Sequence, residues 1–403
     1  MIKWVRLFCC TGLALMVGLP SGEAADFRLS GKSSTVLEWF DNADGDTAVP
    51  LYQYLLLNAS NLATDGPDFR AYGRLSGDPT GNTDADSRLY YAFLEKEGLF
   101  GRLDARLGRQ FLATTAGATV MDGLDLRLRD LGPVSIELFG GGDVRFDEDY
   151  AAGDLVWGTE VSGSFFNSLD LGLSYLQKWD GSELTQELVG FDGNYSFRKM
   201  FDVYSEVQFN YLSNAVSYFA GGAKYYRSPQ WSLSAGYLYS LPVFDSTSIY
   251  SVFAVEEYEE VTGQVQYNIT RGLRAFAQYT REMYDEFADA NVYEVGVEQV
   301  RTARFSGYLV GTLRDDADGQ DLRGVKVRAA YRFTDRLEAG AGAHVDVLER
   351  WLEEDDTTSS QRYWADTTVY LTHHVSVQAK VERIKSALYD YYYGGRVRLN
   401  VLF

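Results

Sequence analysis

The last ten residues, GGRVRLNVLF at positions 394–403, alternate polar or small side chains with large apolar ones up to the final Phe. Successive side chains of an extended strand point to opposite faces. One face carries Val397, Leu399, Val401 and Phe403, and the other carries Arg396, Arg398, Asn400 and Leu402. This pattern fits a strand between lipid and water, but also a soluble antiparallel sheet over a core. The rest of the chain has to distinguish the two.

The same alternation recurs along the whole chain. Lys326, Arg328 and Arg332, for example, alternate with Val325 and Val327. We count about 22 such runs at intervals of about 17 residues, and no stretch has the apolar spacing of an amphipathic helix. The sequence therefore predicts an all-β protein, a transmembrane antiparallel up-and-down β-barrel of about 22 strands (range about 18–22, even), with both termini periplasmic.

A large soluble sandwich, propeller or β-solenoid is the alternative fold. In a sandwich the buried face of every strand is densely apolar. Here one face of many strands holds Arg, Lys, Glu and Gln while the other is apolar. This favours a membrane barrel with a polar lumen.

The N-terminus has the pattern of a cleaved secretory signal peptide. Lys3 and Arg6 precede an apolar run over residues 7–19, which is followed by small residues, so we expect cleavage after residue 24. Residues 25–403 are then a single barrel domain without a plug, because the first strand begins near Phe27. The apolar run is too short to span a membrane as a helix.

Composition excludes several classes of site. The only cysteines, Cys9 and Cys10, lie in the segment expected to be removed, so we expect no disulfide, no thiolate metal site and no attached haem. We expect no metal and no other cofactor. The formal net charge of -20 makes nucleic acid an improbable partner. Three histidines and no spaced nucleophile predict that the chain is not an enzyme.

The spacing between runs predicts tight turns at the periplasmic end and longer connections at the extracellular end. Residues 95–98 and 166–168 are expected among the tight turns, and residues 140–153 and 241–257 among the long loops. The connection over residues 111–121, FLATTAGATVM, is long and uncharged. We predict that it folds inward and narrows the pore.

With its signal peptide, its strands of alternating polar and apolar residues and its terminal Phe, the sequence resembles bacterial outer-membrane β-barrel proteins of the porin type. The resemblance implies an outer-membrane location among lipid and lipopolysaccharide. It also implies that the barrel-insertion machinery reads the last strand, here Val397, Leu399, Val401 and Phe403. Residues 107–110, Leu-Gly-Arg-Gln, are similar to a strand end of some anion- and sugar-conducting porins.

The polar faces predict a basic arc in the lumen. The expected pore-lining residues are Arg70, Arg74, Arg102, Asp104, Arg106, Asp125, Arg127, Arg129, Glu137, Lys326, Arg328, Arg332, Arg396 and Arg398. An acidic arc is expected across the barrel, formed by Glu160, Asp170, Glu206, Glu260, Glu294 and Glu298. Opposed arcs would create a transverse field that discriminates solutes by charge. The predicted function is passive passage of small hydrophilic or charged solutes.

Barrel size leaves an alternative open. About 22 strands enclose a wide lumen, and no plug domain fits in this chain. Either its own loops occlude the lumen, or the chain is the barrel sheath of an extracellular electron-transfer conduit around a periplasmic multihaem cytochrome. Association into a homo-oligomer is a further possibility.

Overall fold

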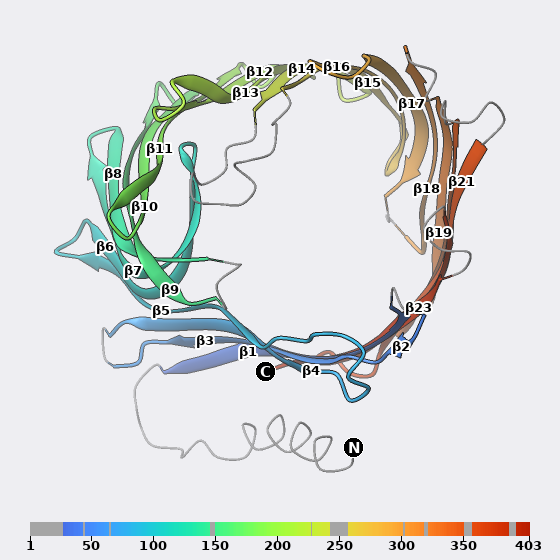
Figure 1. Ribbon diagram of the computed structural model, residues 1–403, viewed down its shortest axis with the longest axis horizontal. Coiled ribbons are helices and arrows are strands. Elements are labelled where there is room, and N and C mark those ends of the chain that lie inside the picture. The colour runs from blue at the N-terminus through green and yellow to red at the C-terminus, as the bar shows by residue number, and fades with distance from the viewer. Residues whose placement is uncertain are drawn as a thin grey trace.

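Twenty-two antiparallel strands close into a barrel around a central opening, and a two-residue strand adds to one connection (Figure 1). The computed structural model describes residues 27–42, 45–63, 66–145, 150–226, 228–241, 257–300, 303–317, 321–349, 357–386 and 392–403. The expected signal peptide lies outside these residues. Within them, no helix is long and apolar enough to cross a membrane.

The strands are β1 (Arg28–Asp41), β2 (Thr47–Ala48), β3 (Leu51–Ser60), β4 (Asp68–Gly77), β5 (Arg88–Leu99), β6 (Leu103–Thr114), β7 (Gly117–Leu131), β8 (Val134–Val144), β9 (Ala152–Phe165), β10 (Leu169–Asp180), β11 (Glu183–Phe197), β12 (Phe201–Asn210), β13 (Ala215–Tyr225), β14 (Trp231–Ser240), β15 (Tyr258–Thr270), β16 (Leu273–Tyr284), β17 (Ala290–Gln299), β18 (Phe305–Asp316), β19 (Leu322–Thr334), β20 (Leu337–Glu349), β21 (Thr357–Tyr370), β22 (Val375–Lys385) and β23 (Tyr392–Leu402).

The first and last strands close the barrel. β1 pairs with β23 in antiparallel register from Lys32 opposite Leu402 to Phe40 opposite Gly394, and it pairs with β3 along its other edge. Every long strand among the described residues therefore has a neighbour on both sides, which leaves this sheet without an open edge along a long strand. The predicted 22-stranded barrel is confirmed. The short strand β2, which pairs Ala48 with Phe40, was not predicted.

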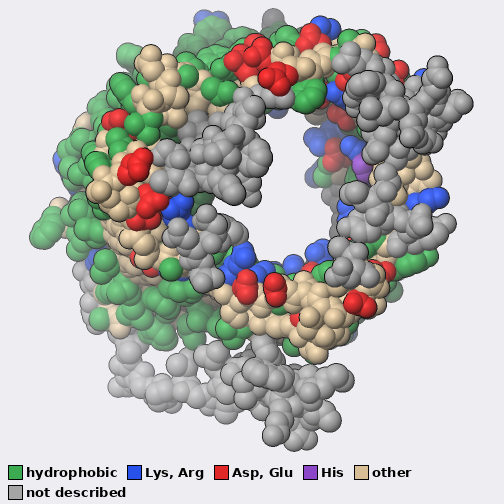
Figure 2. Space-filling model, viewed as in Figure 1, with side chains coloured by type: hydrophobic (Ala, Val, Ile, Leu, Met, Phe, Trp, Pro, Cys, Tyr) green, Lys and Arg blue, Asp and Glu red, His purple; other side chains and the backbone are tan. Residues whose placement is uncertain are grey.

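Apolar side chains cover the outer wall, and charged side chains line the opening (Figure 2). Cross-strand partners share a face, so the register extends this division around the sheet. On β23, Val397 and Leu399 are 37% and 39% exposed on the outer face, and Arg396 and Arg398 lie on the inner face. The alternation in the last strand thus separates outer wall from lumen.

The connections follow the expected pattern only in part. At the end where β1 begins and β23 ends, β7 joins β8 through residues 132–133 and β9 joins β10 through residues 166–168. At the other end, residues 78–87 form a longer connection, but β10 and β11 are joined by only two residues. Nearly all of the long loop expected at residues 241–257 lies outside the described residues. The prediction that residues 95–98 form a turn is wrong. They belong to β5, which continues past an irregularity in its pairing with β6, and the turn follows at residues 100–102.

The segment 111–121 is not a loop. β6 runs to Thr114 and β7 begins at Gly117, so only Thr115 and Ala116 form the turn. The two strands stay paired up to Thr114 opposite Gly117. Phe, Thr and Val in this segment favour extended backbone, and the absence of charge does not oppose pairing. The uncharged connection is therefore a long β-hairpin.

Candidate functional site

The tip of the β6–β7 hairpin lies on the inner wall. The Ala116 amide donates to Ser174 Oγ on β10 at 2.7 Å, and its carbonyl accepts from Gln208 Nε2 on β12 at 2.7 Å. The Thr115 hydroxyl donates to Asp192 Oδ1 on β11 at 2.6 Å. Three wall strands thus hold the two-residue tip. The expectation that this segment folds inward is confirmed.

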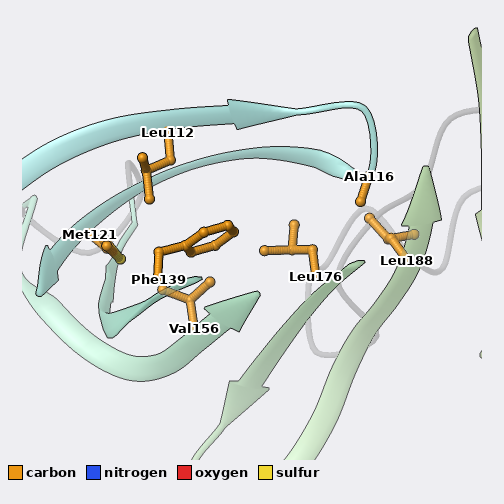
Figure 3. Close-up of a cluster of buried hydrophobic side chains, with 7 residues drawn as sticks. All are labelled: Leu112, Ala116, Met121, Phe139, Val156, Leu176 and Leu188. Carbon is orange, nitrogen blue, oxygen red and sulfur yellow. The ribbon is translucent and has the colours of Figure 1, made fainter. Parts of the chain in front are cut away.

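An apolar cluster lies beneath the hairpin (Figure 3). Its members come from the hairpin and from β8 to β11 and are almost fully buried: Leu112, Ala116, Met121, Phe139, Val156, Leu176 and Leu188. Burying one such large side chain contributes about 1.5–3 kcal/mol. The cluster and the tip hydrogen bonds together hold the hairpin against one side of the lumen.

A glycine allows this close approach. A Cβ atom added at Gly190 on β11 would lie 2.2 Å from the amide nitrogen of Ala116. Real Cβ contacts are not that short, so any larger residue here would push the tip away from the wall. The inward fold therefore depends on a bare backbone opposite the turn.

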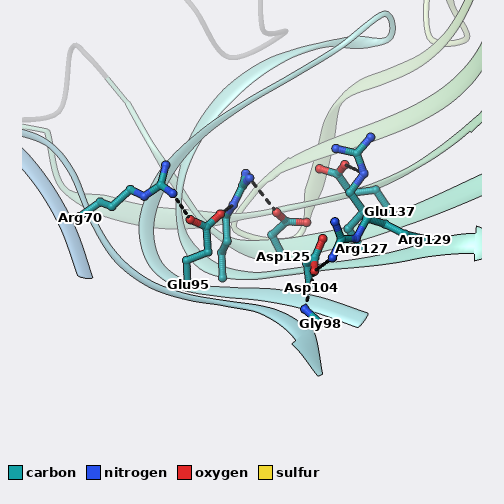
Figure 4. A network of polar contacts seen from close by, with 9 residues as sticks. Arg70, Glu95, Gly98, Asp104, Asp125, Arg127, Arg129 and Glu137 are labelled. Atoms are coloured by element: carbon teal, nitrogen blue, oxygen red, sulfur yellow. Dashed lines mark hydrogen bonds and ion pairs between the residues drawn. The ribbon is translucent and has the colours of Figure 1, made fainter. Parts of the chain in front are cut away.

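The predicted basic arc on β4 to β8 is an ion-pair network (Figure 4). Glu95 bridges two guanidinium groups, with Arg70 Nη2 at 2.7 Å and Arg106 Nε at 2.7 Å, and its side chain is only 4% exposed. Along the same face Arg129 pairs with Asp104 at 2.7 Å and Arg127 with Glu137 at 3.8 Å. Arg106 also approaches Asp125 at 3.7 Å.

These arginines are therefore largely balanced by carboxylates. Sequence reasoning missed Glu95 because it placed this residue in a turn. The position of Glu95 directly opposite Arg106 depends on the register between β5 and β6. The expected basic arc, already offset by Asp104, Asp125 and Glu137, is offset further by Glu95, so charges alternate along this part of the wall.

Two other expected arginines lie at the edges of this network. Arg74 shares the inner face of β4 with Arg70, donates to the Asp86 carbonyl at 2.8 Å, and lies over the Tyr52 ring at 5.1 Å. Arg102 is in the turn between β5 and β6, at the rim where β1 begins and β23 ends, and does not lie on a strand. Because it lies in this turn, it does not line the middle of the lumen.

A row of aromatic rings continues along the inner wall beside the network. Tyr54 and Tyr72 are 6.3 Å apart and stacked, and Tyr72 and Tyr90 are stacked at 4.9 Å. Tyr52 extends the row at 6.2 Å from Tyr54. Alternate tyrosines at positions 52 and 54 were a visible signal for this row, but the sequence prediction considered only charge.

Cations without acidic partners lie on the other side of the β1–β23 seam. Lys326, Arg328 and Arg332 share the inner face of β19, and Arg396 and Arg398 that of β23. Arg328 pairs with Asp366 at 2.9 Å, whereas Lys326, Arg396 and Arg398 have no ion-pair partner among the described residues. Among the described residues, β19 and β23 thus carry three lumen cations without an ion-pair partner.

The predicted acidic residues are distributed over the inner faces of β9 to β17. Glu160, Asp170, Glu206, Glu260, Glu294 and Glu298 alternate with outer-face residues on β9, β10, β12, β15 and β17. Glu298 is neutralised by Arg274 at 2.6 Å, and Glu294 accepts from Thr312 at 3.0 Å.

Histidines contribute no cluster of catalytic or metal-binding type in the described part of the chain. His344 Nε2 lies 2.7 Å from Asp346 Oδ2 on β20, and His373 and His374 are in the β21–β22 turn. No group of three or more His, Cys, Asp or Glu residues suited to a metal ion occurs among the described residues.

No protein-family model matches the sequence, and no curated protein matches it. The translocation pore of the P pilus usher PapC matches over 93% of this chain and 99% of that chain, at 11% identity and a TM-score of 0.51. Pseudomonas aeruginosa OpdQ matches over 94% of this chain and 99% of that chain, at 11% identity and a TM-score of 0.48. Pseudomonas aeruginosa OccK11 (OpdR) matches over 94% and 96%, at 10% identity and a TM-score of 0.47. The likeness to the usher pore shows the fold, a large closed antiparallel barrel.

Proposed function

We propose that this protein is an outer-membrane porin, a channel for passive passage of small hydrophilic or charged solutes. The observation that supports this most directly is an opening lined by charged side chains inside an apolar outer wall (Figure 2). An apolar outer surface suits lipid, and a polar interior suits water-filled passage. The hairpin tip on Ser174 and Gln208 narrows the passage from one side.

The outer membrane is the membrane that fits this architecture. Closed barrels with alternating faces satisfy every backbone hydrogen bond in lipid. The N-terminal signal pattern would direct the chain across the inner membrane, and the terminal strand with Phe403 would serve as the signal for barrel insertion. Both termini would then face the periplasm.

Charge inside the lumen supports a preference for anions. Arg70, Arg106, Arg127 and Arg129 are paired with Glu95, Asp104 and Glu137, so they add little net field. Lys326, Arg396 and Arg398 have no such compensation among the described residues, and their field would raise the local concentration of anions. The basic part of the lumen in this proposal therefore lies on β19 to β23.

A sheath for a periplasmic multihaem cytochrome is the second candidate. It is favoured by two aromatic side chains at turns of the end where β1 begins and β23 ends: Phe100 is 98% exposed and Phe166 is 91% exposed. Both have positive φ, 53° in each case, which is uncommon for a bulky residue. Exposed apolar groups at a periplasmic rim would suit contact with a soluble partner.

Single-channel recording of the purified protein in planar bilayers tests the porin proposal. A porin gives a stable conductance step when reconstituted alone, and a KCl gradient gives a reversal potential of the sign for anion preference. Absence of any step, or only large unstable currents, contradicts the proposal. Co-purification with a haem-containing protein from the periplasm, lost on changing Phe100 and Phe166 to Ser, would support the sheath instead.

A further inference from the structure

A recess on the inner wall collects cations around a tryptophan. Its volume is about 330 Å³, and it is lined by Tyr308, Lys326, His344, Arg362, Trp364 and Lys380. The register places Lys326, His344 and Arg362 in one row across β19, β20 and β21. Figure 2 shows Lys, Arg and His side chains gathered on the inner wall in view.

The tryptophan forms the floor of the recess. A Cβ atom added at Gly342 on β20 would lie 2.3 Å from the indole of Trp364, so the ring rests directly on the backbone of the neighbouring strand. The guanidinium carbon of Arg362 is 5.9 Å from the ring centroid, and the ammonium of Lys380 is 6.0 Å from it. The two cations therefore border an aromatic surface.

Of the three permanent cations that line the recess, one carboxylate, Glu382, pairs with two. Glu382 Oε2 accepts from Arg362 Nη2 at 2.5 Å and from Lys380 Nζ at 2.8 Å, which fixes the positions of both side chains. Lys326 has no ion-pair partner among the described residues, and the carboxylate of Asp346 lies against His344. The recess thus has an excess of positive charge and N–H donors that are already oriented.

We propose that this recess binds a dianionic oxoanion of the phosphate type, either free or as the terminal group of a larger solute. Several N–H donors around a small recess match the acceptor oxygens of a tetrahedral dianion, and hydrogen bonds between charged groups are stronger than neutral ones. An attached planar group would rest on Trp364. The inference deepens the proposed function by naming a solute class, and its binding step does not require conduction.

Calorimetric titration of the folded full-length barrel in detergent tests this directly. Inorganic phosphate should bind saturably in chloride buffer. K326Q should weaken phosphate binding about ten-fold or more, as expected for one charge-assisted hydrogen bond. K224Q is the matched control, because Lys224 is on the inner face of β13 and also has no ion-pair partner among the described residues. It should leave the phosphate affinity unchanged.

Phenyl phosphate distinguishes the two sources of the dianion. Tighter binding of phenyl phosphate than of inorganic phosphate, removed by W364L, supports a solute with a planar group. Equal affinities for phenyl phosphate and inorganic phosphate, both weakened to the same extent by K326Q, support free phosphate. Each variant is first shown to be folded by its heat-modifiable mobility on gels.

Two results would overturn the inference: no saturable phosphate binding by the wild-type barrel, or equal weakening by K326Q and K224Q. If the channel conducts ions and phosphate does not bind, the inference fails and the porin proposal stands. If phosphate binds in detergent and no conductance is found, the porin proposal fails and the site stands.

Discussion

The amide nitrogen of Ala116 lies 2.7 Å from the hydroxyl oxygen of Ser174, a residue 58 positions further along the chain. This contact joins the tip of the β6–β7 hairpin to the inner face of β10. It makes the hairpin part of the lumen wall, so residues that border the tip should affect the passage of solutes.

Gly190→Ala should release the hairpin. The added methyl group would meet the Ala116 amide nitrogen at 2.2 Å. Overpacking of this kind costs about 1–3 kcal/mol, enough to reduce the docked population at least about five-fold. We expect a larger single-channel conductance or frequent steps to a larger one. Gly263→Ala on β15 is the control, because no atom lies within 4 Å of its added Cβ. Equal conductance for both variants would show that the hairpin does not limit passage.

Glu95→Gln should shift ion selectivity toward anions. It removes the charge that Arg70 and Arg106 share and leaves both guanidinium groups in the lumen. One uncompensated charge at about 4 Å in water is worth about 1 kcal/mol, or up to about five-fold in local anion concentration. Reversal potentials in a KCl gradient measure the change. Glu183→Gln, at an exposed strand end without an ion-pair partner among the described residues, should leave the reversal potential unchanged. A shift of the reversal potential toward cation selectivity would show that Glu95 does not offset the charges of Arg70 and Arg106.

The loop at residues 78–87 should loosen only in acid. Burial raises the pKa of Asp78, but hydrogen bonds from the Thr80 hydroxyl and from the Thr80, Asn82 and Val49 amides outweigh this and hold the pKa below its usual 3.8. A group with a lowered folded pKa stabilises the loop above its unfolded pKa, and this stabilisation is lost as pH falls through the folded value.

Hydrogen exchange at the Asn82 and Thr83 amides, which donate to Asp78 Oδ2 at 2.9 and 3.0 Å, measures this effect. Protection of these amides should fall below about pH 4 in the wild type. In D78N, protection should be lower at neutral pH and nearly independent of pH over the same range. Wild-type protection that begins to fall near pH 6 would assign the transition to another group.

Phe403→Ala should reduce insertion of the barrel into the membrane more than it reduces the free energy of unfolding. The backbone of Phe403 pairs with Gly31 through two hydrogen bonds, of 2.9 and 3.2 Å, which the substitution retains. The side chain is 37% exposed, so its loss should cost less than about 1 kcal/mol of unfolding free energy. We expect less folded barrel in membranes of cells and normal refolding in detergent. Leu402→Ala, next to it on the other face, is the control. Equal folded amounts for both variants would exclude a special role of the terminal Phe.

The strand number and closed architecture could be predicted because they depend on a local period. Residues i and i+2 of a strand face the same side wherever the strand lies, so Val397, Leu399 and Val401 already defined an outer face in the sequence. The sequence prediction was less accurate where strands end. The strand boundaries near Glu95 and Thr114 depend on pairing with a partner strand. Polar residues at the rim of a barrel occur in turns and in strands, so they do not mark where a strand ends.

The ion-pair network around Glu95 and the recess around Trp364 could not be predicted, because both depend on the register between strands. A shift of one residue in register turns each side chain to the other face of the sheet, and a shift of two changes every cross-strand partner. Charge was visible in the sequence, but the carboxylate opposite each arginine was not. Alternation therefore indicated which residues face the lumen, and pairing decided which of them remain uncompensated.

The sequence by itself determined a membrane-type antiparallel barrel of about 22 strands, because an alternating pattern needs only the geometry of a single extended chain. Only the tertiary structure decided that residues 111–121 are a hairpin docked on Ser174, and that Lys326 gathers with Arg362 and Lys380 around one recess. Both features arise from contacts between strands far apart in the sequence. Such contacts depend on barrel closure and register, which no local pattern specifies.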